Sequence, residues 1–110
     1  MNYFTYLLFI LLFDIHTLVL TQSVDNNVKT IFMIGNSTMA DKPFNNGNPE
    51  KGWGQIFPLY FQEGIKIENH AVNGRSTKSF IDEGRWDSVQ NKIKPGDYVI
   101  IEFGHNDAKK

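Results

Sequence analysis

Three short polar strings in this chain carry residue types from which a nucleophilic catalytic site can be built. Ser37 offers a hydroxyl nucleophile, Gly74 offers a backbone amide, and Asn106 offers a side-chain amide. A hydroxyl beside such donors can attack a carbonyl group while the donors stabilise the oxyanion that forms. The strings are Gly35–Thr38 (GNST), Asn73–Ser76 (NGRS) and Gly104–Asp107 (GHND).

Each string, taken alone, has a simpler structural explanation. Ser37 is of a residue type preferred at helix N-caps, and this role is favoured when only its own string is considered. Gly74 could serve a turn that needs a positive φ angle. Asn106 could belong to an ordinary polar loop, with Asp107 accepting hydrogen bonds that brace it. His105 lies beside Asn106, but its position does not direct the ring towards Ser37.

Three segments are predicted to form strands, and each precedes one of the strings. Lys29–Ile34 and Tyr98–Phe103 are apolar runs typical of strands buried in a parallel sheet. Ile65–Asn69 alternates in polarity, which predicts a short strand near a sheet edge. The carboxyl ends of parallel strands meet at one edge, where ligands bind in open α/β sheets. We therefore expect the three strings to converge there.

Two segments between these strands have helical spacing. Trp53–Phe61 is the first, and Pro58 is expected to break it or to lie in its first turn. The second begins at Ser79, with Asp82 completing a Ser-x-x-Asp helix start, although Gly84 weakens it. The loop of residues 41–51 is rich in proline, glycine and asparagine and is predicted to lie on the surface. The order of elements predicts an α/β fold with a parallel sheet.

Composition narrows the function classes. The chain has 110 residues, a net charge of −1 and no cysteine. A charge this close to zero gives no indication of a nucleic-acid partner, and the lack of cysteine excludes disulfides and thiolate zinc sites. The histidines have no metal-ligand spacing, so we expect neither a metal nor another cofactor.

The N-terminal segment resembles an export signal. Tyr3–Leu20 is nearly all apolar, and the small residues Thr21 and Ser23 suit cleavage after Ser23. Asp14 and His16 interrupt the apolar run, so no stable membrane span is expected. Residues 1–23 are therefore interpreted as a signal peptide of a secreted or periplasmic protein, with an uncleaved membrane anchor as the alternative. Residues 24–110 form the folded part.

Taken in order, the motifs resemble those of the SGNH or GDSL-like hydrolases, and within them most closely the rhamnogalacturonan acetylesterase group. The resemblance implies a flavodoxin-like three-layer α/β/α sandwich with a five-stranded parallel sheet, of which this chain holds about the first three strands. The motifs that carry it are IGNSTMAD (34–41), GWGQ (52–55), NGRSTKSFIDEGRW (73–86) and KPGDYVIIEFGHND (94–107).

The resemblance also implies the roles of the candidate residues. Ser37 would be the nucleophile, and its own amide, the Gly74 amide and the Asn106 side chain would bind the oxyanion. The implied reaction is metal-free removal of acetyl groups from pectic polysaccharide through an acyl-enzyme. Arg75 and Trp53 are candidates for substrate binding. Arg75 could instead pair with a surface acid, and Trp53 could instead anchor the core.

The chain departs from the family pattern at two places. Asn36 stands where the first block usually has aspartate, and we expect a modest effect because asparagine still forms hydrogen bonds. The Asp-x-x-His block that holds the acid and base of the family is not among these 110 residues. We do not assign the base to His105, and we expect the 110-residue chain to be an N-terminal portion without activity alone. Alternatives are an inactive truncated or non-catalytic carbohydrate-binding protein, or an SGNH lipase or thioesterase.

Overall fold

The computed structural model describes residues 28–45 and 47–109. The predicted signal peptide, residues 1–23, lies outside the described residues. Among the residues that are described, no helix has the length and apolar character needed to cross a membrane.

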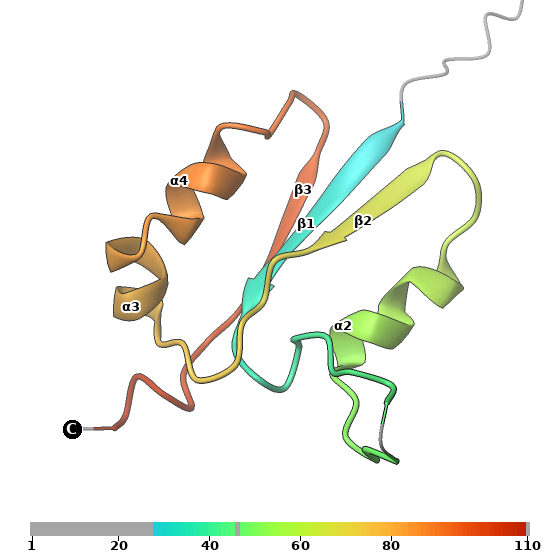
Figure 1. Ribbon diagram of the computed structural model, residues 1–110. Helices are drawn as coiled ribbons and strands as arrows, with labels where there is room; N and C mark the ends of the chain where they lie inside the picture. The colour runs from blue at the N-terminus through green and yellow to red at the C-terminus, as the bar shows by residue number, and fades with distance from the viewer. Residues whose placement is uncertain (1–27, 46, 110) are drawn as a thin grey trace, which may run out of the picture.

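The described residues contain one parallel sheet of three strands (Figure 1). The strands are β1 (Lys29–Gly35), β2 (Ile65–Asn69) and β3 (Tyr98–Glu102). Their order is β2-β1-β3, so β1 is central and pairs with both neighbours. All three predicted strands are confirmed, as is the position of Ile65–Asn69 at an edge of this sheet.

The strand β1 is buried on both faces because its two sets of alternating side chains enter two different cores. Phe32 and Ile34 pack with Phe80 and Val89 on one face. On the other face, Ile31 and Met33 form a second cluster with Met39, against which Phe57 of the helical segment 53–60 packs. Helices therefore cover both faces, and Figure 1 shows the sheet running between them. This is the predicted three-layer α/β/α arrangement.

The first helical segment is short and changes type at its centre. The helix α2 (Trp53–Ile56) continues into the 3₁₀-helix η1 (Phe57–Tyr60). Pro58 lies in the first turn of η1, where its missing N–H has no partner to lose. The prediction for Pro58 is thus confirmed.

The second helical segment is divided into α3 (Thr77–Asp82) and α4 (Arg85–Gln90). Gly84 separates them with a left-handed φ of 69°, a conformation that interrupts an α-helix. The predicted start at Ser79 is wrong, because the N-cap is Ser76, whose hydroxyl accepts a hydrogen bond from the Ser79 amide at 3.1 Å. Asp82 is also wrong as a helix-start acid, since it ends α3. A second serine three residues upstream provides the better cap.

The edge strand β2 carries an acid whose ionisation stabilises the fold. Hydrogen bonds from Lys66, then from His70 and Lys92, lower the pKa of Glu68 from 4.5 to about 2. A lowered folded-state pKa stabilises the protein above the unfolded-state value, and this contribution is lost as the pH falls from 4.5 towards 2. We expect Glu68→Gln to lower the free energy of unfolding near neutral pH. Its effect should be much smaller at a pH near the lowered pKa of Glu68. Urea unfolding across that range measures this, and a pH-independent difference between the two chains would contradict it.

Candidate active site

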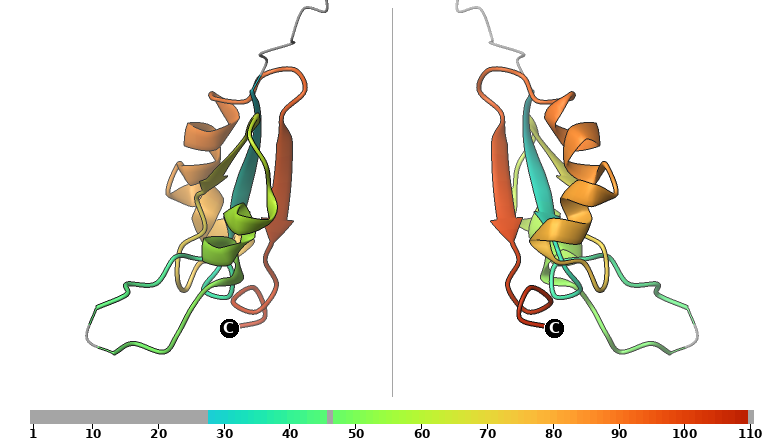
Figure 2. Two further views of the ribbon diagram at one scale, coloured as in Figure 1. Left: turned by 90° about the vertical axis from the view of Figure 1, so that its right-hand side faces the viewer. Right: turned by 90° about the vertical axis from the view of Figure 1, so that its left-hand side faces the viewer.

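Hydrogen bonds bring the three polar strings together at the carboxyl edge of the sheet. The loops that follow the three strands lie at this same end of the molecule (Figure 2). Each bond joins one loop or strand end to another: Val72 N to Gly35 O at 3.0 Å, Asn36 N to Glu102 O at 3.2 Å, and Asn106 Nδ2 to Arg75 O at 3.0 Å. The predicted convergence is confirmed, while the catalytic roles of the residues remain predictions.

The turn that carries Ser37 is capped by its neighbour Asn36. The Asn36 carbonyl accepts hydrogen bonds from the amides of Met39 at 3.3 Å and Ala40 at 3.0 Å, which closes a single helical turn. The Asn36 side-chain oxygen accepts the Thr38 amide at 3.1 Å, as a cap does. The capping role considered for Ser37 is therefore wrong. Within the described residues, the Ser37 hydroxyl has no hydrogen-bond partner.

Two backbone amides of the loops at this edge remain available as donors. Neither Ser37 N nor Gly74 N donates to an acceptor within residues 28–45 and 47–109. Gly74 has a φ of 75°, so its predicted need for a positive φ is confirmed. Unpaired amides at the edge of a parallel sheet form the type of electropositive position at which a developing oxyanion is stabilised.

The third string is held in place by its own side chains. Asn106 Nδ2 donates one hydrogen to Arg75 O, which leaves its second amide hydrogen for another acceptor. Asp107 accepts hydrogen bonds from the amides of Gly104 at 3.0 Å and Thr77 at 2.9 Å. Hydrogen bonds from Thr77, and then from Gly104, lower the pKa of Asp107. The expectation that Asp107 braces this loop is confirmed.

Glu102 links the serine turn to the start of α2, a contact that sequence reasoning missed. Its carboxylate accepts hydrogen bonds from the Thr38 hydroxyl and, at 2.9 Å, from the Trp53 indole N–H. Trp53 is 39% exposed and packs edge-on against Phe57, so it is no core anchor. One feature of the sequence could have indicated this contact. Glu102 is a single acid inside an apolar strand, and burying a carboxylate is costly unless it is paired.

Removing this carboxylate should change the environment of one tryptophan only. In Glu102→Ala we expect the Trp53 indole N–H resonance to move to the position of a water-exposed indole, while that of Trp86 stays unchanged. Losing a hydrogen bond to a charged acceptor should also lower the free energy of unfolding by about 2 kcal/mol. Two-dimensional nitrogen–proton NMR and urea unfolding measure these effects. An unmoved Trp53 resonance would contradict the contact.

The GWGQ motif is explained by close packing against the serine turn. A Cβ atom on Gly52 would lie 1.9 Å from the Ala40 carbonyl oxygen, and one on Gly54 would lie 2.4 Å from Met39 O. Between them, Trp53 N donates to Thr38 O at 2.9 Å. The two glycines therefore let the backbone of this segment lie directly against the turn that carries the nucleophile candidate.

Other candidate side chains have partners away from Ser37. The Arg75 Nε lies 3.1 Å from both carboxylate oxygens of Glu83, so Arg75 pairs with a surface acid and its substrate-binding role remains a prediction. His105 is exposed, and His70 Nε2 lies 3.0 Å from Glu68 Oε2. Within the described part of the chain, no group of three or more His, Cys, Asp or Glu side chains could hold a metal ion.

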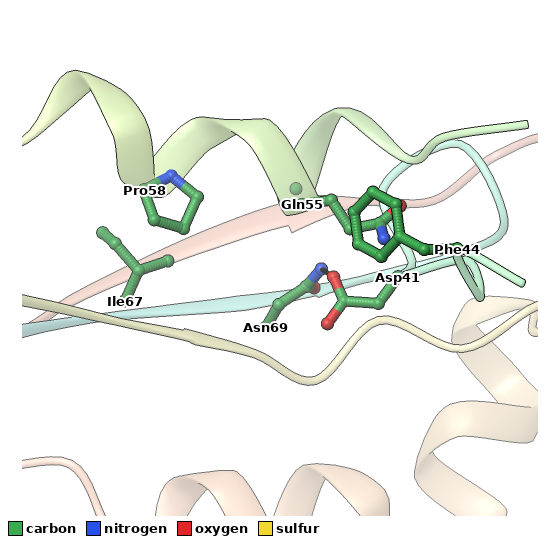
Figure 3. A pocket seen from close by; sticks show the side chains of 7 residues that line it. Asp41, Phe44, Gln55, Pro58, Ile67 and Asn69 are labelled. Carbon is green, nitrogen blue, oxygen red and sulfur yellow. Dashed lines mark hydrogen bonds between the residues drawn. The ribbon is translucent and has the colours of Figure 1, made fainter.

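A hollow of about 290 Å³ lies between α2–η1 and the edge strand β2 (Figure 3). Its polar side chains bond mainly to one another and to nearby backbone: Asn69 Nδ2 donates to Asp41 at 2.7 Å, and Gln55 Nε2 donates to Lys42 O at 2.6 Å. These bonds fix the base of the 41–51 loop against the body of the domain.

Comparison with known proteins identifies the family of the chain. Residues 31–110 match the family of GDSL-like lipases and acylhydrolases. The chain belongs to this family. One GDSL-like relative is the rhamnogalacturonan acetylesterase RhgT of Bacillus subtilis, 47% identical over 79 residues, which cover 72% of this chain and 34% of RhgT. Another is the rhamnogalacturonan acetylesterase of Emericella nidulans, 40% identical over 82 residues, which cover 73% of this chain and 29% of that protein.

The fold is also that of a solved structure. The crystal structure of protein YxiM from Bacillus subtilis, which is named an uncharacterized esterase, superposes with a TM-score of 0.67 at 32% identity. The match covers 74% of this chain and 23% of YxiM. The chain thus spans about a third of the length, or less, of the GDSL-like relatives that it matches.

Proposed function

We propose that this chain supplies the nucleophile and the oxyanion donors of a serine esterase that removes acetyl groups from pectic polysaccharide. The observation that carries the proposal is that the Ser37 hydroxyl and the amides of Ser37 and Gly74 all lack a partner among the described residues, on loops that meet at the carboxyl edge of the sheet. The names of the RhgT and Emericella relatives support acetylated rhamnogalacturonan as the substrate.

In the proposed reaction, Ser37 Oγ attacks the acetyl carbonyl carbon. The amides of Ser37 and Gly74 and the second hydrogen of Asn106 Nδ2 stabilise the resulting oxyanion. The sugar alcohol leaves with a proton, an acetyl-serine ester remains, and water releases acetate from it. A base must take the proton from Ser37, and the family supplies it from an Asp-x-x-His block that is not among these 110 residues.

We propose further that the protein is exported, to the periplasm or the cell exterior, by the signal peptide of residues 1–23. A pectic polymer is too large to enter a cell, so its deacetylation requires an exported enzyme. Mass spectrometry of the processed protein tests this, with a mature N-terminus at Val24 expected. An exported protein whose N-terminal residue is still Met1 would contradict this proposal.

A chimera tests the activity with a complete domain of known sequence. The 79 aligned residues of this chain replace the matching segment of RhgT, which then supplies the rest of the domain. We expect the chimera to release acetate from acetylated rhamnogalacturonan and to prefer short acyl esters of sugars over long-chain esters. RhgT itself is the positive control, and circular dichroism verifies folding. A folded chimera that hydrolyses only long-chain esters, or no ester, would contradict the proposal.

A further inference from the structure

Lys42 is a buried lysine in a loop that its composition predicts to be exposed. Its exposed fraction is 8%, and it is the only charged residue that is buried among the described residues. Its backbone is fixed as well, because its carbonyl accepts a hydrogen bond from Gln55 Nε2 at 2.6 Å. Burying a cation is costly unless oxygen acceptors surround it, so its partners determine what it does.

The ammonium group of Lys42 joins the two loops that carry the candidate oxyanion amides. Its Nζ donates to the backbone carbonyl of Ser37 at 2.6 Å and to the side-chain oxygen of Asn73. Ser37 and Asn73 lie on different loops, and Asn73 immediately precedes Gly74. A single side chain thus spans from the serine turn to the residue beside the second amide donor.

The bonding pattern makes Lys42 a donor and not a base. An ammonium group has three hydrogens and no lone pair, and here it gives hydrogens to two oxygens. A general base must instead accept a proton from the serine hydroxyl. The bonds of Lys42 go to the backbone of Ser37 and to Asn73, so its effect on the reaction passes through the placement of other groups.

We propose that Lys42 is a positioning residue that sets the Gly74 amide relative to Ser37. This inference rests on the proposed function, because it concerns the geometry of the same oxyanion site. Donors that are already in place need no reorganisation when charge develops, and small displacements reduce catalysis strongly. The ammonium charge also adds a positive potential beside the position of the oxyanion.

Nitrogen–proton NMR of the full 110-residue chain tests the bridge without relying on activity. In Lys42→Met we expect the amide resonances of both Ser37 and Gly74 to shift, and Lys42→Arg should restore them in part. The matched control is Lys51→Met, in the same loop, because Lys51 is exposed and contacts only its own loop, through two backbone carbonyls and the Phe44 ring. Unchanged Ser37 and Gly74 resonances in a folded Lys42→Met chain would overturn the proposal.

A second variant keeps the test decisive if Lys42→Met does not fold. Asn73 is exposed, so Asn73→Ala removes only the acceptor at the far end of the bridge. Because Lys42 transmits the change, the Ser37 amide should shift although Asn73 contacts Lys42 and not Ser37 itself. A Ser37 resonance that does not move in Asn73→Ala would overturn the proposal.

Kinetics of the chimera separate positioning from simple stabilisation. We expect Lys42→Met to lower kcat by tenfold to a hundredfold with KM changed less than about twofold, a loss smaller than that for removing an oxyanion donor outright. Lys42→Arg should recover part of kcat. A kcat that falls only with the folded fraction would overturn the proposal. If the unmodified chimera is inactive, the proposed function fails while the NMR result still decides the role of Lys42.

Discussion

Replacing Ser37 with alanine is expected to reduce acetate release by the chimera by about six orders of magnitude, the loss seen when the serine nucleophile of a triad is removed. The reason is that the hydroxyl forms the covalent bond to the acetyl group, and the oxyanion donors alone retain only a small residual rate. Because the Ser37 side chain neither caps the turn nor has a hydrogen-bond partner among the described residues, the substitution should leave the free energy of unfolding nearly unchanged.

The matched control for this prediction is Ser88→Ala. Ser88 is an exposed serine in α4 whose hydroxyl donates only to the Gly84 carbonyl, at 3.1 Å. We expect its removal to leave the rate of acetate release unchanged. A Ser37→Ala chimera that keeps a rate within tenfold of the parent would rule Ser37 out as the nucleophile, since loss of a true nucleophile costs far more.

Replacing Gly52 with alanine should have the largest effect on the structure of the site. The φ of Gly52 is −79°, which alanine adopts readily, so the whole cost arises from the new methyl group. That group would lie 1.9 Å from the Ala40 carbonyl oxygen, a backbone atom that cannot move alone. We expect the free energy of unfolding to fall by about 3 kcal/mol or more, the upper range for overpacking. The serine turn should be displaced, with loss of acetate release.

A glycine in open space provides the control for Gly52→Ala. Gly64 has a φ of 91°, and nothing lies within 4 Å of a Cβ placed on it. Gly64→Ala should therefore cost only the backbone strain, about 1–2 kcal/mol, and leave catalysis intact. Urea unfolding and acetate release of both variants measure the difference. Equal losses in the two variants would show that the contact with Ala40 is not the cause.

The sheet could be predicted from the sequence because its signal is contained within each strand. Residues 31–34 (IFMI) are apolar on both alternating faces, and the structure buries both faces of this part of β1. The helix start at Ser79 was mispredicted for a local reason, since two serines three residues apart both fit a cap. Only the backbone geometry of the folded chain identifies Ser76 as the N-cap.

The supports of the site could not be predicted because they depend on long-range contacts. Lys42 was assigned to the surface with its loop, since proline and asparagine dominate that segment, and its bond to Asn73 joins it to a residue 31 positions along the chain. The bonds of Glu102 to Thr38 and Trp53 likewise join residues far apart in the chain. Ser37, Gly74 and Asn106, by contrast, could be nominated because each directly follows a recognisable strand or its turn.

The substitution of asparagine at position 36 has a structural explanation. The side-chain oxygen of Asn36 accepts the Thr38 amide at 3.1 Å, which an aspartate oxygen in the same place could also do. Asn36 is buried, with 1% of its surface exposed, next to the turn that bonds Glu102. A neutral amide avoids placing a second carboxylate beside that of Glu102, and the modest effect of this substitution stays a prediction.

Covalent labelling tests the central claim most directly. A fluorophosphonate reacts with a serine that is activated as a nucleophile beside an oxyanion site, and peptide mass spectrometry locates the adduct. For the chimera we predict one adduct per chain, on the peptide that contains Ser37, and none in Ser37→Ala. A folded chimera that is labelled at another serine, or that remains unlabelled while RhgT reacts, would contradict an active site around Ser37.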